Sequence, residues 1–211
     1  MKIKSLSLLL GVLALAFVSS GCGYNTLQSK QQNVKASWSE VENQLQRRAD
    51  LIPNLFEAAK AAGVQEQEVF GQIANARSQL LNAKSAAPQG EGGDKSPEQK
   101  QAVLDANGGL GAALGRLLVI TENYPTLKSN ENFLKFQDEL AGTENRIGTA
   151  RTRYNTATQD YNTSRGSFPT VISAKIFGFK EEPYFKADEG AKQVPVIKAD
   201  TLRNNQNGPK K

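Results

Sequence analysis

A seven-residue repeat of apolar side chains in the second half of the chain constrains the fold most strongly. One position of the repeat is filled by Phe133, Leu140, Ile147, Tyr154 and Tyr161, and the other by Phe136, Thr143, Ala150 and Ala157. A repeat sustained over several heptads is typical of a long helix that packs along a seam with its neighbours. The pattern predicts a helix that starts near Ser129 or Asn130 and closes at Gly166 and Pro169.

Three further helices are predicted by apolar residues at steps of three and four. The first is expected to begin at a capping box of Asn25 and Gln28 and to end at Gly63. Its apolar stripe consists of Leu27, Val34, Trp38, Val41, Leu45, Ile52, Leu55 and Ala59. The second runs from Val69 to Ala83. The third starts with Ser96 as the cap and Pro97 at its first turn, and Pro125 stops it.

These patterns predict an all-α fold, namely an antiparallel up-and-down four-helix bundle with long helices. The segment from Phe168 to Phe185 is apolar enough to dock on the bundle as a C-terminal docking segment. Residues 188–211 have little apolar content, and we expect an extended or disordered tail. A narrow bundle of this kind is expected to have no cleft.

The N-terminal residues predict export from the cytoplasm. Lys2 and Lys4 precede an apolar run over residues 6–18, and small residues then lead to Cys22, the single cysteine. This order is that of a bacterial secretory signal, and a cysteine after glycine indicates lipoprotein processing. We therefore expect a signal peptide at 1–21, a lipidated Cys22 at the start of a domain over 22–187, and a cell-envelope location, periplasmic if the host has two membranes. An uncleaved anchor and cleavage by ordinary signal peptidase are the alternatives.

The residue types that are missing narrow the chemistry. The chain has no histidine, and its one cysteine is the expected lipid site, so histidine-based catalysis, zinc sites and disulfides are excluded. From Cys22 onward there are 24 basic and 21 acidic residues without a strong basic cluster, which argues against nucleic acid as a partner. We expect no metal, no cofactor and no catalytic residue.

The densest charge cluster is Arg47, Arg48 and Asp50. Arg48 lies in the apolar stripe, so its guanidinium is expected to need a buried partner such as Glu144 or Asp138 on the fourth helix. An internal ion pair, an anion-binding site and a contact with a partner protein all stay open for this cluster. Pro53 lies inside the first helix next to Asn54, where we expect a kink.

Two motifs on the later helices have mainly structural interpretations. Gly111 and Gly115 are spaced for close contact with a neighbouring helix. Tyr154 and Tyr161 belong to the core stripe, with hydroxyls that should reach a polar neighbour, and each is followed by asparagine. Arg151, Tyr154 and Asn155 complete the candidate interaction or structural cluster.

Several short strings occur together in a fixed order along the chain. They are Gly23-Tyr24-Asn25, QLQRRADLIPNL at 44–55, ENYPTLK at 122–128, and the pairs Asn132-Phe133, Glu139-Leu140, Ala150-Arg151, Tyr154-Asn155, Tyr161-Asn162, Phe168-Pro169, Gly178-Phe179 and Tyr184-Phe185. Through these strings the sequence resembles the LemA family over residues 23 to about 187. The resemblance implies an antiparallel helical bundle held at the cell envelope by its N-terminus, without an established enzymatic activity. Family members commonly keep an uncleaved N-terminal helix, so a lipidated cysteine is a departure.

We therefore expect a non-catalytic lipoprotein that acts as scaffold or adaptor for a membrane-associated partner. The resemblance implies such a partner, because family members tend to occur beside membrane proteases and one branch is tied to magnetosome membranes. A periplasmic binder of a small ligand or anion through Arg47, Arg48 and Asp50 is the alternative.

Overall fold

The computed structural model describes residues 2–90 and 93–185, with side chains from Gly23 onward. Its long helices are α1 (Lys2–Ala61), α2 (Gln67–Ser85), α3 (Pro97–Ile120) and α5 (Glu131–Gly166). Three short ones are η2 (Thr121–Asn123), α4 (Pro125–Lys128) and α6 (Thr170–Ile176). The described ranges are helical without strands, which confirms the all-α class. The expected tail at 188–211 lies outside the described residues.

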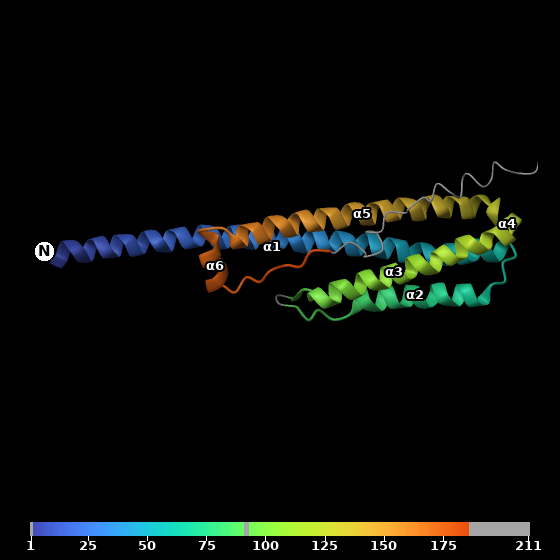
Figure 1. Cartoon of the computed structure of the whole chain (residues 1–211), viewed down its shortest axis with the longest axis horizontal. Helices are drawn as coiled ribbons and strands as arrows, with labels where there is room; N and C mark the ends of the chain where they lie inside the picture. The colour runs from blue at the N-terminus through green and yellow to red at the C-terminus, as the bar shows by residue number, and fades with distance from the viewer. Residues whose placement is uncertain (1, 91–92, 186–211) are drawn as a thin grey trace, which may run out of the picture.

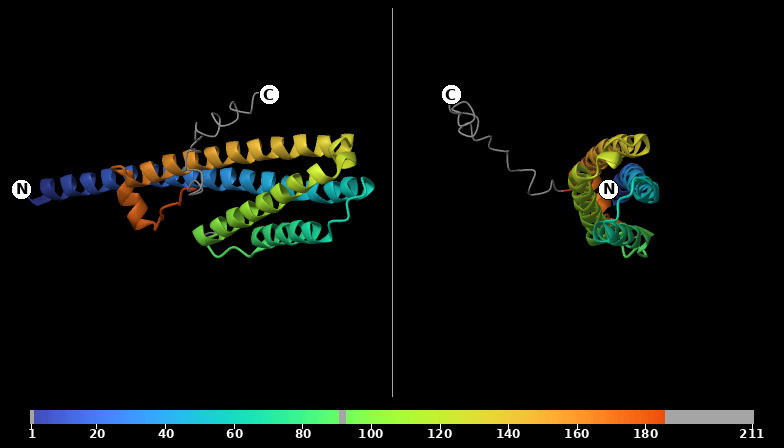
Figure 2. Two further views of the ribbon diagram at one scale, coloured as in Figure 1. Left: turned by 45° about the vertical axis from the view of Figure 1, so that its right-hand side comes forward. Right: turned by 90° about the vertical axis from the view of Figure 1, so that its right-hand side faces the viewer.

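The helices alternate in direction along one rod, as expected. Helices α1 and α5 lie side by side, and the α2–α3 hairpin covers the part of this pair that is distant from the N-terminus (Figure 1). Beside the other part lie α6 and the extended segment that follows it (Figure 2). A closed four-helix bundle is not confirmed, because α3 and α5 stay apart and are joined by side chains.

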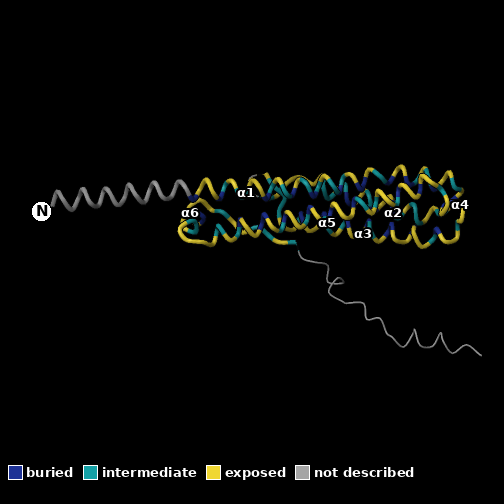
Figure 3. The backbone as a smooth tube through the Cα atoms, turned by 90° about the horizontal axis from the view of Figure 1, so that it is seen from above, coloured by how far each residue is buried: buried dark blue, intermediate teal, exposed yellow. Residues whose placement is uncertain are grey.

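The expected apolar stripes form the core. Every stripe residue of the first helix is buried, from Leu27 to Ala59, and in α5 the repeat buries both Tyr154 and Tyr161 completely. Buried positions recur along the inner sides of the long helices (Figure 3). Leu140 is only partly buried, because the neighbouring space toward α3 is open.

The first helix is longer than the sequence predicted. Asn25 and Gln28 do not cap it, because α1 runs without a break from Lys2 through both residues. A capping box depends on only a few neighbouring residues. Here the residues before Asn25 are already helical, so the helix continues through it. The helix also continues through Pro53, as expected.

The predicted end at Gly63 is confirmed. Gly63 has a φ of 80°, a conformation that glycine adopts without a Cβ penalty. Its N–H donates to the Lys60 carbonyl at 2.9 Å, and the N–H of Val64 donates to the Ala59 carbonyl at 3.1 Å. This is a Schellman motif, and the buried Val64 supplies its apolar contact.

The expected start of α3 is also confirmed. The Ser96 hydroxyl accepts from the Gln99 N–H at 3.3 Å, and the Gln99 side chain accepts from the Ser96 N–H at 3.0 Å. The end differs: α3 stops at Ile120, and Pro125 begins the short α4. Asn130 caps α5 by accepting from the N–H groups of Asn132 and Phe133.

Candidate functional site

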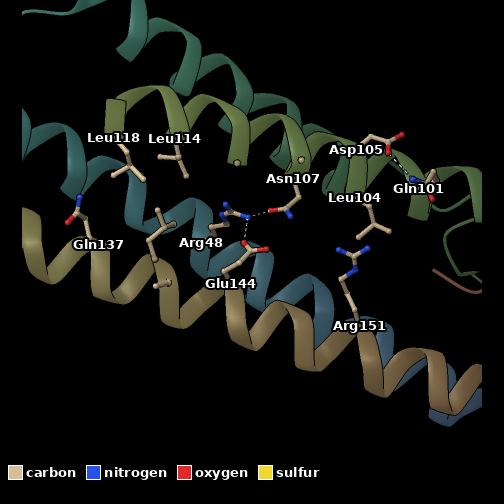
Figure 4. Close-up of a pocket in the computed structure, with 15 residues that line it drawn as sticks. Arg48, Gln101, Leu104, Asp105, Asn107, Leu114, Leu118, Gln137, Glu144 and Arg151 are labelled. Carbon is tan, nitrogen blue, oxygen red and sulfur yellow. Dashed lines mark hydrogen bonds and ion pairs between the residues drawn. The ribbon is translucent and has the colours of Figure 1, made fainter. Parts of the chain in front are cut away.

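A groove of about 720 Å³ lies between α3 and α5. Arg48 of α1 projects into it from behind, between the two walls (Figure 4). Its apolar lining is Leu104, Leu114, Leu118, Leu140 and Ala141. The expectation of a narrow bundle without a cleft is therefore wrong, since the α2–α3 hairpin packs against α1 through α2 while α3 and α5 stay apart.

Arg48 joins the three helices around the groove. Its Nη1 donates to Asn107 Oδ1 of α3 at 2.9 Å and lies 2.7 Å from Glu144 Oε2 of α5. Arg48 is only 6% exposed, whereas the Glu144 side chain is 56% exposed. Burial lowers the pKa of Arg48, and the nearby Glu144 charge opposes this effect. Of the two carboxylates expected as partners of Arg48, Glu144 is the one that lies beside it. This contact is the internal ion pair that was one of the three interpretations of the cluster.

Asn107 was not singled out from the sequence, although a signal was present. The buried face of α3 is Lys100, Val103, Asn107, Leu110, Ala113, Leu114 and Leu117. Two polar residues thus occupy positions that continue the apolar spacing. A polar side chain in such a position indicates a buried polar contact.

A row of glycines forms part of the α3 wall. Gly108, Gly111 and Gly115 line the groove, and a Cβ added at Gly108 or Gly115 would meet nothing within 4 Å. A Cβ at Gly111 would meet only Arg48 Nη2, at 3.4 Å. The expected close contact of Gly111 and Gly115 with a neighbouring helix backbone is absent from the described chain, because Gly111 faces the Arg48 side chain and Gly115 faces open space.

The other candidate residues do not meet at one site. Arg47 and Asp50 are exposed, and Asp50 accepts a hydrogen bond from Gln46 at 2.8 Å. Pro53 is exposed, and Asn54 lines a separate hollow of about 410 Å³ against α5. Arg151 lines the groove and lies 5.8 Å from the Phe185 ring centre.

Tyr154 and Asn155 belong to a second cluster, which we call the tail clasp. It comprises Tyr154, Asn155, Tyr161, Asn162 and Arg165 of α5, which bind the backbone of residues 179–185. The tyrosine hydroxyls donate to the carbonyls of Pro183 and Lys180, at 3.1 and 2.7 Å. Residues 179–185 of the expected docking segment therefore lie on α5, and both tyrosines have the polar partners that were expected.

Each asparagine of the tail clasp binds both backbone groups of one residue. Asn162 accepts from the Glu182 N–H at 3.1 Å and donates to its carbonyl at 2.8 Å. Asn155 accepts from the Phe185 N–H at 2.9 Å and donates to its carbonyl at 3.5 Å. Seven helical residues rise about 10.5 Å, which is close to the length of about 10 Å spanned by three extended residues. The heptad repeat of α5 therefore matches every third residue of the docked segment.

Lys100 connects the tail clasp to α3. Its Nζ lies 3.1 Å from Glu182 Oε2 and 3.4 Å from the Tyr154 hydroxyl, and 5.7 Å from the Trp38 ring centre. Burial acts to lower the pKa of Lys100, but the contacts with Tyr154 and Glu182 outweigh it and raise the pKa. Burial raises the pKa of Tyr154, since a buried phenolate is unfavourable.

The groove contains two carboxylates, but they lie apart. Figure 4 shows Asp105 next to Gln101, from which it accepts a hydrogen bond at 2.8 Å, and Glu144 beside Arg48. Among the described residues there is no group of three or more histidine, cysteine or acidic side chains that could hold a metal ion. By length and composition alone, one described helix, Pro97–Asn123, could span a membrane, although core helices of soluble proteins meet the same criterion.

Comparison with known proteins places the chain in a family. The LemA family model matches residues 37–198. Two relatives, magnetosome proteins MamQ 1 and MamQ 2 of Paramagnetospirillum magneticum, are each 31% identical over 186 residues, covering 82% of this chain and 68% of the relative. Magnetosome protein MamQ of Magnetospirillum gryphiswaldense is 30% identical over 206 residues, covering 91% of this chain and 75% of the relative. With most of its length matched in both comparisons, the chain belongs to the LemA family.

Proposed function

We propose that this protein is a non-catalytic adaptor of the cell envelope, anchored to a membrane at its N-terminus, whose α3–α5 groove binds a helix of a membrane-associated partner. The order of charge, apolar run and cysteine in residues 1–22 supports attachment to a membrane, through lipid on Cys22. The magnetosome names of the relatives agree with a role at a membrane-bounded structure.

The groove is the observation on which the proposal depends. On α3 its lining extends from Gln101 to Leu118, and on α5 from Gln137 to Arg151. The distance along α3 from Gln101 to Leu118 is about 25 Å at 1.5 Å per residue, which is long enough for several turns of a bound helix. The glycines of the α3 wall leave the backbone accessible, so a partner helix can approach it closely. Apolar anchors of a helix in such a groove recur at steps of three and four.

The anion-binding alternative has less support. It needs Arg47, Arg48 and Asp50 to act together, but Arg47 and Asp50 are exposed while Arg48 is buried. The Arg48 guanidinium is already engaged by Glu144 and Asn107. An added anion would have to displace a carboxylate at 2.7 Å.

The adaptor proposal is tested by photocrosslinking in intact cells of the source organism. A photoreactive amino acid replaces Leu118, which lines the groove and is 42% exposed, or Val119, which is 72% exposed and lies outside it. We expect a discrete crosslinked product from position 118 and none above background from position 119.

A glycine pair supplies the matched control. Gly115→Leu fills the groove, whereas Gly109→Leu adds the same side chain to α3 where the lining does not extend, and neither added Cβ meets an atom within 4 Å. The product from position 118 should disappear with Gly115→Leu and persist with Gly109→Leu. Equal products in the two variants would overturn the groove as the binding site.

A further inference from the structure

We propose that α6 and its flanking residues form a lipid-contact surface that enters the headgroup region of the membrane holding the N-terminus. The surface consists of Phe168, Ile172, Ile176 and Phe177, with Tyr24 of α1, and we call it the α6 patch. These side chains are 82%, 48%, 66%, 54% and 37% exposed, in that order. Such a concentration of exposed apolar side chains marks a contact surface.

The α6 patch is fixed to the part of α1 that follows Cys22. Gly23 is buried under α6, and a Cβ added there would lie 2.7 Å from Ser173 Oγ. Tyr24 packs edge-on against Phe177, with ring centres 4.8 Å apart. The buried side of α6 carries Ser173 and Ala174, so Ile172 and Ile176 are left on its exposed side.

The position of the α6 patch along α1 matches the depth of a bilayer interface. The apolar run of residues 6–18 ends five residues before Gly23, which is about 7.5 Å of helix. The polar region on each side of the hydrocarbon core is about 5–8 Å thick. A lipid on Cys22 would bring Gly23 to the same level, so both modes of anchoring place the α6 patch at the headgroups.

Charge and orientation also favour a lipid surface. Helix α6 itself carries the exposed Lys175 and no acidic residue, which suits anionic headgroups. Helix α6 lies across the direction of α1 (Figure 1). When α1 stands along the membrane normal, α6 therefore lies in the plane of the interface, as amphipathic surface helices do.

The test uses the full chain reconstituted in phosphatidylcholine–phosphatidylglycerol vesicles whose acyl chains carry bromine, a contact quencher of tryptophan. Phe177→Trp places a reporter in the α6 patch. Ser29→Trp is the control for nearness to the membrane. Ser29 is exposed on α1 and lies about 9 Å beyond Gly23 along the helix, away from the proposed membrane. The native Trp38 is buried and contributes the same background to each variant.

We expect brominated lipid to remove most of the added emission of Phe177→Trp and to leave that of Ser29→Trp nearly unchanged. Both positions are exposed, so both variants should keep the helical circular dichroism of the parent, and Ile176→Trp repeats the measurement. Emission from both patch positions that is quenched no more than that of Ser29→Trp would overturn the proposal and indicate a protein as the occupant of the patch.

Discussion

The tail clasp makes a prediction whose size can be worked out from its hydrogen bonds. Asn162→Ala removes two bonds to Glu182, at 2.8 and 3.1 Å, with a net stabilisation of about 1 kcal/mol each. The docked segment should therefore lose about 2 kcal/mol, which increases its opening equilibrium about 30-fold. Asn155→Ala removes one good bond and one at the 3.5 Å limit, so about 1 kcal/mol and a roughly fivefold effect are expected.

Native-state hydrogen exchange with mass spectrometry measures this opening directly on peptides that cover residues 179–185. Protection from exchange in this segment should fall most in Asn162→Ala and less in Asn155→Ala. It should not change in Asn145→Ala, which makes the same replacement at an exposed site on the same helix. The reasoning is refuted if Asn162→Ala exchanges in this segment as slowly as the parent, because the asparagine pairs would then contribute nothing to docking.

Three further predictions concern the Arg48–Glu144 ion pair, the packing of Gly23 under α6, and the effect of pH on stability. Glu144→Gln leaves Arg48 without its ion pair, but Glu144 is 56% exposed and screened, so about 1 kcal/mol and a drop of about 2–4 °C in the melting temperature by calorimetry are expected. Gly23→Leu places its Cβ about 2.7 Å from a side-chain oxygen of α6, so faster hydrogen exchange is expected over residues 170–176 while the melting temperature of the long helices changes little. The contacts of Lys100 with Tyr154 and Glu182 raise its pKa, so the stability that its charge adds is lost only in alkali. Burial raises the pKa of Tyr161 to about 12, so the stability that its neutral hydroxyl adds is present below about pH 10 and is lost as the pH rises through about 12. Tyr161→Phe should weaken that alkaline loss, as followed by circular dichroism.

The sequence predicted the helices well because periodicity is a local property. The heptads of α5 identified its core, and Arg48 in an apolar stripe correctly indicated a buried guanidinium with a carboxylate partner, for which the sequence left Glu144 and Asp138 open. Where it failed locally, a competing signal was stronger. Asn25 resembles an N-terminal cap, but the residues before it are already helical, so this start signal does not begin a new helix.

The groove could not be predicted from spacing. Helical repeats show which side of each helix is buried, but which neighbouring helices touch depends on how the α2–α3 hairpin packs against the α1–α5 pair. Lys100 and Asn107 continue the α3 stripe and could have been recognised as buried polar residues. Their partners, Glu182 and Arg48, are 82 and 59 residues away, and no local pattern connects them.

The uninterrupted course of α1 through residue 22 gives the protein a fixed reach. With Gly23 at the bilayer surface, as proposed, the turn after Ala61 stands about 57 Å above it, and Arg48 about 38 Å, at 1.5 Å of helix per residue. Because α1 is continuous at its base, the distance between the membrane surface and the groove is fixed. Any protein that fills the groove must present its binding helix near that height.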